Sequence, residues 1–173
     1  MQPTNREKVY IFDANVFINL HRIDMHSIRL PDEVWTKLDE MMTGGKIISH
    51  RTVYDEVVSG SKKPDKVSAW LQPRKTHFEL STARQIEVMA NVVNKFPKLI
   101  DINSERDQAD PWLVALAAEK IEQDTVHEYV VVTQESQAST VKLPAACKAF
   151  GVHSIPLAEF FEENGITFGV SFN

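Results

Sequence analysis

Four carboxylates lie where secondary-structure elements are expected to begin or end: Asp13, Glu56, Asp110 and Glu135. An all-oxygen ligand set suits hard divalent ions such as Mg²⁺ or Mn²⁺ and selects against zinc or copper. The six histidines show no HExxH spacing and no second cysteine is present, so no softer ligands accompany these acids. A divalent ion held in this way could activate a water molecule and neutralise the leaving oxygen in phosphodiester hydrolysis. The expected cofactor is therefore Mg²⁺ or Mn²⁺, since unaided carboxylates would repel the substrate.

Asp110 stands before a proline and a run of helix formers, which predicts Asp110 as a helix N-cap and Pro111 as the first helical residue. Residues 112–118 are all apolar, so every face of this helix is expected to be covered by protein. Asp110 would then lie at the mouth of a buried helix. A plain N-cap, worth about 1 kcal/mol, is the structural alternative. Asp107, three residues earlier, is a secondary candidate for an additional carboxylate.

Asp13 directly follows residues 8–12, a continuous apolar run typical of a strand buried on both faces. In an open parallel sheet the carboxyl ends of the strands face the functional crevice. Asn15 lies close enough to orient Asp13 or a metal-bound water. The alternative is a local side-chain turn after the strand.

Glu56 belongs to a predicted helix over residues 51–59 and can border its buried face, although a solvated glutamate is the simpler interpretation. Residues 128–133 form the clearest strand pattern in the chain. Thr133 and Glu135 would point to the same side if the extended conformation continues past the strand.

Four basic residues follow the Glu56 helix and could contact phosphate near the acids: Lys62, Lys63, Arg74 and Lys75. A solvated loop is the alternative for this segment.

Strands alternate with helices along the chain. Further strands are expected at 46–49 and 152–155, and further helices at 16–20, 31–42, from a Thr82–Gln85 capping box to about 96, at 144–150 and at 157–164. The alternation predicts an α/β three-layer fold with a mainly parallel central sheet. We expect one domain over residues 1–173, with flexible first residues and a flexible C-terminal tail.

Length and composition agree with one domain, because 173 residues that are 43% hydrophobic can form one good core. The single Cys147 excludes a disulfide framework and suits a reducing cytosol. No signal peptide or membrane span is evident, so a cytoplasmic location is expected. The net charge of −5 argues against binding nucleic acid by bulk electrostatics, but it does not exclude a nuclease whose acids are neutralised by metal.

Four motifs occur in order: Phe12-Asp13-Ala14-Asn15-Val16-Phe17-Ile18, Glu56 in a valine-rich helix, Ala109-Asp110-Pro111-Trp112-Leu113-Val114-Ala115-Leu116-Ala117, and Val131-Val132-Thr133-Gln134-Glu135. In this order and spacing the chain resembles the PIN-domain ribonucleases. Among them it is most similar to a branch known only as a domain of unknown function, near the virulence-associated-protein-C (VapC) type toxins. The resemblance covers nearly the whole chain, including Cys147-Lys148-Ala149-Phe150-Gly151-Val152 before a short strand.

The resemblance implies that Asp13, Glu56 and Asp110 bind metal and that Asn15 and Thr133 support the site. The chain departs from the family pattern at Glu135, where aspartate is usual. This longer side chain could bind metal through water or not at all. The resemblance also implies an RNA substrate, an antitoxin protein that blocks the acidic cleft, commonly with a basic side chain, and a common tendency to form homodimers.

Two rival hypotheses stay open. Residues 9–16 also resemble the first motif of haloacid-dehalogenase-type phosphatases, in which the aspartate is a covalent nucleophile. That family expects a second acid where Asn15 stands and a late acidic pair where only Glu135 is found. The other rival is an inactive PIN-like module that binds RNA or protein. The three retained acids argue against that module, and the net charge argues against strong RNA binding without metal.

Overall fold

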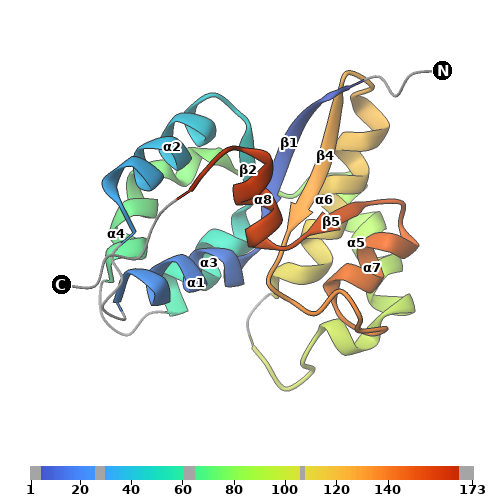
Figure 1. The fold of residues 1–173 in the computed structure, drawn as a ribbon. Coiled ribbons are helices and arrows are strands. Elements are labelled where there is room, and N and C mark those ends of the chain that lie inside the picture. The colour runs from blue at the N-terminus through green and yellow to red at the C-terminus, as the bar shows by residue number, and fades with distance from the viewer. Residues whose placement is uncertain (1–4, 26–29, 61–64, 106–107, 168–173) are drawn as a thin grey trace.

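The computed structural model describes residues 5–25, 30–60, 65–105 and 108–167 (Figure 1). The predicted flexible ends, residues 1–4 and 168–173, lie outside this range. In chain order the elements are β1 (Glu7–Phe12), α1 (Ala14–Met25), α2 (Asp32–Thr43), β2 (Ile47–His50), α3 (Arg51–Gly60), α4 (Lys66–Leu71), the 3₁₀ helix η1 (Gln72–His77), β3 (Phe78–Glu79), α5 (Ala83–Lys95), the 3₁₀ helix η2 (Pro97–Leu99), α6 (Ala109–Gln123), β4 (His127–Val132), α7 (Leu143–Ala149), β5 (His153–Ile155) and α8 (Leu157–Glu163).

The strands form one five-stranded sheet in the order β3-β2-β1-β4-β5, and every pairing is parallel. The chain first adds β2 and β3 on one side of β1, then β4 and β5 on the other. The order therefore reverses between β1 and β4, where an open α/β sheet opens its crevice. The register pairs Phe12 with Val132, so β1 and β4 end at the same level.

Helices cover both faces of the sheet, with α5, α6 and α7 on one side and α1, α2, α4 and α8 on the other (Figure 1). The second layer is held to β1 by aromatic contacts, since Phe160 of α8 packs edge-on against Tyr10 and Phe12, and Phe17 of α1 packs against Phe12. The predicted three-layer α/β fold with a parallel sheet is confirmed.

Most predicted elements shift by only one or two residues, although α1 extends to Met25 where we expected a short helix over 16–20. Residues 66–79 form α4, η1 and β3, for which we predicted no element. Asp65 begins α4 by accepting a hydrogen bond from the Ser68 backbone N–H at 2.7 Å. The two residues of β3 are too few to produce an alternating sequence pattern, so sequence periodicity cannot reveal them.

The predicted N-cap at Asp110 is wrong, because α6 begins at Ala109 and Gln108 is its N-cap residue. The Gln108 side chain bonds to the Asp101 backbone in both directions: its Oε1 accepts from the N–H at 2.8 Å and its Nε2 donates to the C=O at 2.9 Å. Pro111 is still tolerated because the first turn needs no intrahelical N–H donor. Asp110 is left in the first turn with its carboxylate not used for capping.

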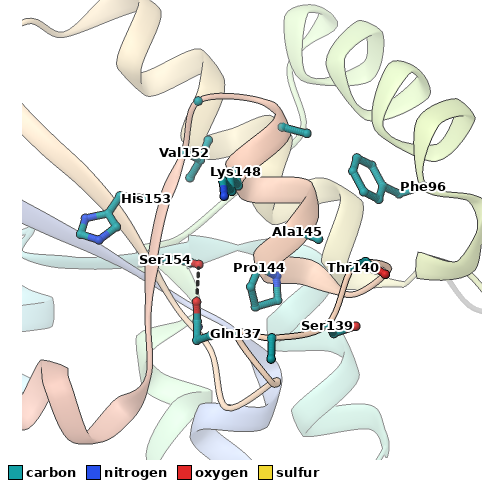
Figure 2. A pocket seen from close by; sticks show the side chains of 13 residues that line it. Phe96, Gln137, Ser139, Thr140, Pro144, Ala145, Lys148, Val152, His153 and Ser154 are labelled. Atoms are coloured by element: carbon teal, nitrogen blue, oxygen red, sulfur yellow. Dashed lines mark hydrogen bonds between the residues drawn. The ribbon is translucent and has the colours of Figure 1, made fainter.

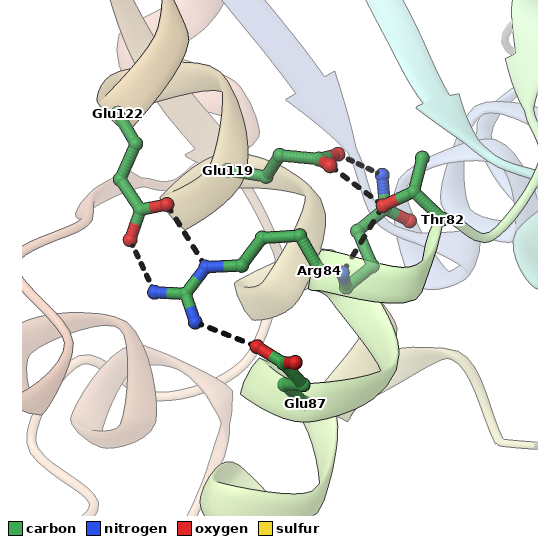
Figure 3. A network of polar contacts seen from close by, with 6 residues as sticks. Thr82, Arg84, Glu87, Glu119 and Glu122 are labelled. Carbon is green, nitrogen blue, oxygen red and sulfur yellow. Dashed lines mark hydrogen bonds and ion pairs between the residues drawn. The ribbon is translucent and has the colours of Figure 1, made fainter.

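Helix α6 is buried along most of its length, as predicted, and a polar cluster fixes α5 against it (Figure 3). Glu119, only 4% exposed, accepts a hydrogen bond from the Thr82 hydroxyl at 2.6 Å and another from the Gln85 carboxamide. Thr82 caps α5 by accepting from the Gln85 backbone N–H. The predicted capping box is thus only half formed, because the Gln85 side chain bonds to Glu119 and not to the cap.

Within the described part of the chain, no helix is long and apolar enough to cross a membrane.

We predict that Gln85→Ala lowers the free energy of unfolding by about 2–3 kcal/mol, because it leaves the buried Glu119 carboxylate without one of its donors. Urea unfolding measures this loss. Glu87→Ala, which removes an exposed partner of Arg84 one turn away, is the matched control and should leave stability nearly unchanged. Equal effects of the two changes would contradict a structural role for the buried cluster.

Candidate active site

Asp13 lies at the carboxyl end of β1, at the point where the strand order reverses, and is only 3% exposed. Its backbone N–H donates to the Val132 carbonyl, which continues the β1–β4 ladder by one residue. Its Oδ2 accepts a hydrogen bond from the Thr133 hydroxyl at 2.8 Å. The end of the neighbouring strand therefore fixes the direction of the Asp13 carboxylate.

The Thr133 hydroxyl joins three parts of the site. It accepts hydrogen bonds from the Asn15 amide and from the Glu135 backbone N–H, both at 3.2 Å. Asn15 Oδ1 in turn accepts from the Gln134 backbone N–H at 3.0 Å. Because both neighbours of the hydroxyl are donors, its own proton must go to Asp13. Asn15 and Thr133 thus orient the Asp13 carboxylate.

Glu135 lies two residues after Thr133 and turns toward the start of α7. Its Oε2 accepts a hydrogen bond from the Leu143 backbone N–H at 2.9 Å. The longer glutamate side chain is therefore anchored to a second element.

Glu56 and Asp110 come from the two helices α3 and α6. Glu56 is exposed as a residue, but its carboxylate is partly covered where it accepts a hydrogen bond from the Ala109 backbone N–H, one of the donors at the start of α6 that have no partner within the helix. This bond ties α3 to the helix turn that carries the half-buried Asp110.

The four acids lie close enough to repel one another. Burial raises the pKa of Asp110 to about 8, assisted by the charges of Asp13, Glu135 and Glu56. Burial likewise raises the pKa of Asp13 to about 7, with contributions from Glu135 and Glu56, although the hydrogen bond from Thr133 lowers it. Burial also raises the pKa of Glu56, against the hydrogen bond from Ala109. This site favours the binding of positive charge.

Lys142 is a neighbour of the site that the sequence did not indicate. It is exposed at the N-cap of α7, directly before Leu143, which anchors Glu135. Its positive charge lowers the pKa of Asp110. No spacing rule links this loop lysine to Asp110, because only the packing of α7 beside α6 brings them together.

Arg74 and Lys75 contact other parts of the chain. The Arg74 guanidinium lies over the Trp70 ring at 4.3 Å and donates to Asp39 at 2.7 Å, and the Lys75 ammonium lies 5.3 Å from the Tyr54 ring. Lys62, Lys63 and Asp107 lie outside the described residues.

The donor chemistry of the four acids and the hydroxyl fits a hard divalent ion. Among the described residues, however, no three His, Cys, Asp or Glu side chains are already arranged as a ligand set. Three of the four carboxylates accept hydrogen bonds, Asp13 from Thr133, Glu135 from Leu143 and Glu56 from Ala109, as ligating carboxylates commonly do. Because no ligand set is preformed among these described residues, ligation would require the side chains to adjust.

A cavity of about 920 Å³ lies elsewhere, between the 137–140 loop, α7 and β5 (Figure 2). Two of its lining residues are joined by a hydrogen bond, in which the Ser154 hydroxyl donates to Gln137 Oε1 at 3.3 Å. None of the four acids lines it. A smaller cavity of about 580 Å³ does reach Glu56, between α3 and the segment that leads into α6. The converging charges, and not cavity size, identify the candidate site.

The raised pKa of Asp13 predicts a stability that falls with pH in the metal-free protein. The folded state holds its proton more tightly than the unfolded chain, whose Asp pKa is 3.8, so stability is lost as the pH rises from about 4 to about 7. We expect Asp13→Asn to be more stable than the parent by roughly 2–4 kcal/mol at pH 8 and to differ little near pH 4.

Urea unfolding in EDTA across this pH range measures the effect. Asp32→Asn, at the exposed start of α2, provides a carboxylate control outside the site. Parallel pH profiles for the parent and Asp13→Asn would contradict the raised pKa of Asp13.

The family model described as Domain of unknown function (DUF4411) matches residues 10–168 of the chain. Among solved structures, the fold is similar to a chain in the crystal structure of VapBC2 from Rickettsia felis bound to a DNA fragment from their promoter. The TM-score is 0.51 and the identity 15%, over 86% of this chain and 98% of that one. No curated protein sequence matches.

Proposed function

This chain belongs to the family described as a domain of unknown function (DUF4411), and we propose that it is a metal-dependent endoribonuclease that hydrolyses RNA phosphodiesters. The observation that carries the proposal is the convergence of Asp13, Glu56, Asp110 and Glu135 at the carboxyl edge of a parallel sheet, where burial, assisted by the neighbouring negative charges, raises the pKa of Asp13 and Asp110.

Asp13, Glu56, Asp110 and Glu135 are the proposed ligands. When bound, Mg²⁺ or Mn²⁺ would lower the pKa of an attacking water and offset charge on the leaving oxygen. Thr133 holds the Asp13 carboxylate in one orientation, and Asn15 holds Thr133. Glu56 keeps the first turn of α6 in place through Ala109.

Among the described residues, Lys142 is a basic side chain placed to contact the substrate phosphate, because its charge acts on Asp110 from the exposed start of α7. A phosphate contact of this kind positions the backbone without reading sequence. Lys62, Lys63, Arg74 and Lys75 remain proposals for more distant contacts.

The sequence resemblance to VapC-type toxins and the fold shared with a chain of a VapBC2 complex support a toxin role with a protein antitoxin as partner. An antitoxin carrying a basic side chain would complement the acidic cleft. A homodimer is a further proposal drawn from the same resemblance.

We predict that the purified protein cleaves structured RNA with Mn²⁺ or Mg²⁺ and loses the activity in EDTA. Asp13→Asn and Asp110→Ala should each reduce cleavage by roughly 100-fold or more, because each removes a proposed ligand. Gel analysis of end-labelled RNA measures the rate, and Asp32→Asn is the matched control. Undiminished cleavage by Asp110→Ala would contradict the ribonuclease assignment. Hydrolysis of a small phosphate ester without cleavage of RNA would favour the haloacid-dehalogenase-type phosphatase.

Lys142→Ala should lower kcat/KM about ten- to hundred-fold by removing a charge-assisted phosphate contact, and Lys142→Arg should restore most of it. Initial rates at two salt concentrations measure the change, which should shrink at high salt. Lys148→Ala removes an exposed lysine from the same helix α7 and should act like the parent protein. If both alanine variants behave alike, Lys142 does not contact the phosphate.

A further inference from the structure

Two cavities meet where the chain enters α6. The first is the cavity of about 580 Å³ that Glu56 lines, and the second has about 470 Å³ and lies between α5 and α6. Both are bordered by Asp101, Ser104 and Gln108. A ligand with one part at the acids could therefore extend into the second cavity.

The side chains that line the second cavity are more apolar than those that line the first. Its walls include Met89 and Val93 of α5 and Pro111 and Trp112 of α6. Among the described residues that line it, none is Lys or Arg. The Asn94 carboxamide and the shared Ser104 and Gln108 add polar groups at its edge. A flat ligand with apolar faces and polar edges fits this lining.

Trp112 is held in a fixed orientation. Its ring stacks on His50 with centroids 5.0 Å apart and an interplanar angle of 8°. The His50 Nδ1 accepts a hydrogen bond from the Thr52 backbone N–H, so Nε2 carries the proton and donates to the Ser81 hydroxyl at 3.1 Å. Trp112 is half-exposed, although it belongs to the apolar run 112–118. The indole ring is therefore held in place as a surface on which a flat ligand can stack.

An ordered turn presents Ile102 beside this surface. The Asp101 carboxylate accepts from the Asn103 backbone N–H at 2.9 Å, and Gln108 fixes the Asp101 backbone in both directions. Ile102 lines the cavity although it is 87% exposed. Such an exposed aliphatic side chain on a fixed turn can cover one side of a bound ring.

We propose that the cavity between α5 and α6 binds an unpaired base of the RNA, next to the phosphodiester held at the four acids. This inference rests on the proposed function. The neutral base stacks beside Trp112 and Ile102, while the charged backbone stays near the acids and Lys142. The site favours unpaired stretches of an RNA, such as its loops, because a paired base would have to give up its pairing and stacking to enter.

Steady-state cleavage of a short single-stranded RNA tests the site. Trp112→Ala and Ile102→Ser should raise KM by about ten- to hundred-fold, the loss expected for one stacked base, with kcat nearly unchanged. Trp112→Phe should restore most of the affinity. Val126→Ser, an equally simple change of an exposed aliphatic at the opposite end of the sheet, should have no effect.

An abasic nucleotide beside the cleaved bond gives an independent measurement. It should raise KM for the parent protein and add little to the loss in Trp112→Ala, because the same contact is already missing. Unchanged KM in both Trp112→Ala and Ile102→Ser, with cleavage intact, would overturn the base site and leave the ribonuclease assignment standing.

Binding separates the two proposals. Fluorescence anisotropy of a labelled single-stranded RNA with Mg²⁺ should show weaker binding to Asp13→Asn/Trp112→Ala than to Asp13→Asn. If this difference appears while the parent cleaves no RNA, the base site stands and the ribonuclease fails. If neither cleavage nor the difference appears, both proposals are overturned.

Discussion

The parallel pairing of β1 with β4 is the constraint on which the rest of the site depends. It ends both strands at the same level, so that Asp13 and Thr133 face each other across one hydrogen bond of 2.8 Å. Glu135 follows from the same strand end, while Glu56 and Asp110 are positioned by helices that pack against one another. A shift of one residue in this register would turn the site residues toward the opposite face of the sheet.

The sequence predicts those parts of the structure that depend on local pattern. The apolar run before Asp13 has few alternatives to a buried strand, and the fold class follows from alternating patterns of this kind. The predicted start of α6 was wrong because the Gln108 side chain bonds to the Asp101 backbone. That contact spans seven residues, and helix propensity does not encode it. Glu56 could be placed on a helix, but its bond to Ala109 depends on how α3 meets α6.

Tertiary packing explains what the sequence could not supply. Lys142 lies in a loop far from Asp110 along the chain, and α7 must dock before the two charges meet. Trp112 is a second example. It belongs to an apolar sequence run that predicts burial, whereas in the structure it is half-exposed and stacks on His50. The metal, the RNA substrate and the roles of the four acids remain proposals.

The crowding of negative charge at the sheet edge also affects how such a chain evolves. Proteins sit only slightly above the stability they need, and most random substitutions lower it. Under the proposed function, a substitution that neutralises Asp13 or Asp110 would abolish the chemistry while removing a carboxylate that burial and its neighbours disfavour, so loss of activity would coincide with a gain in stability. Lineages released from selection for the chemistry should therefore drift readily toward well-folded, inactive copies.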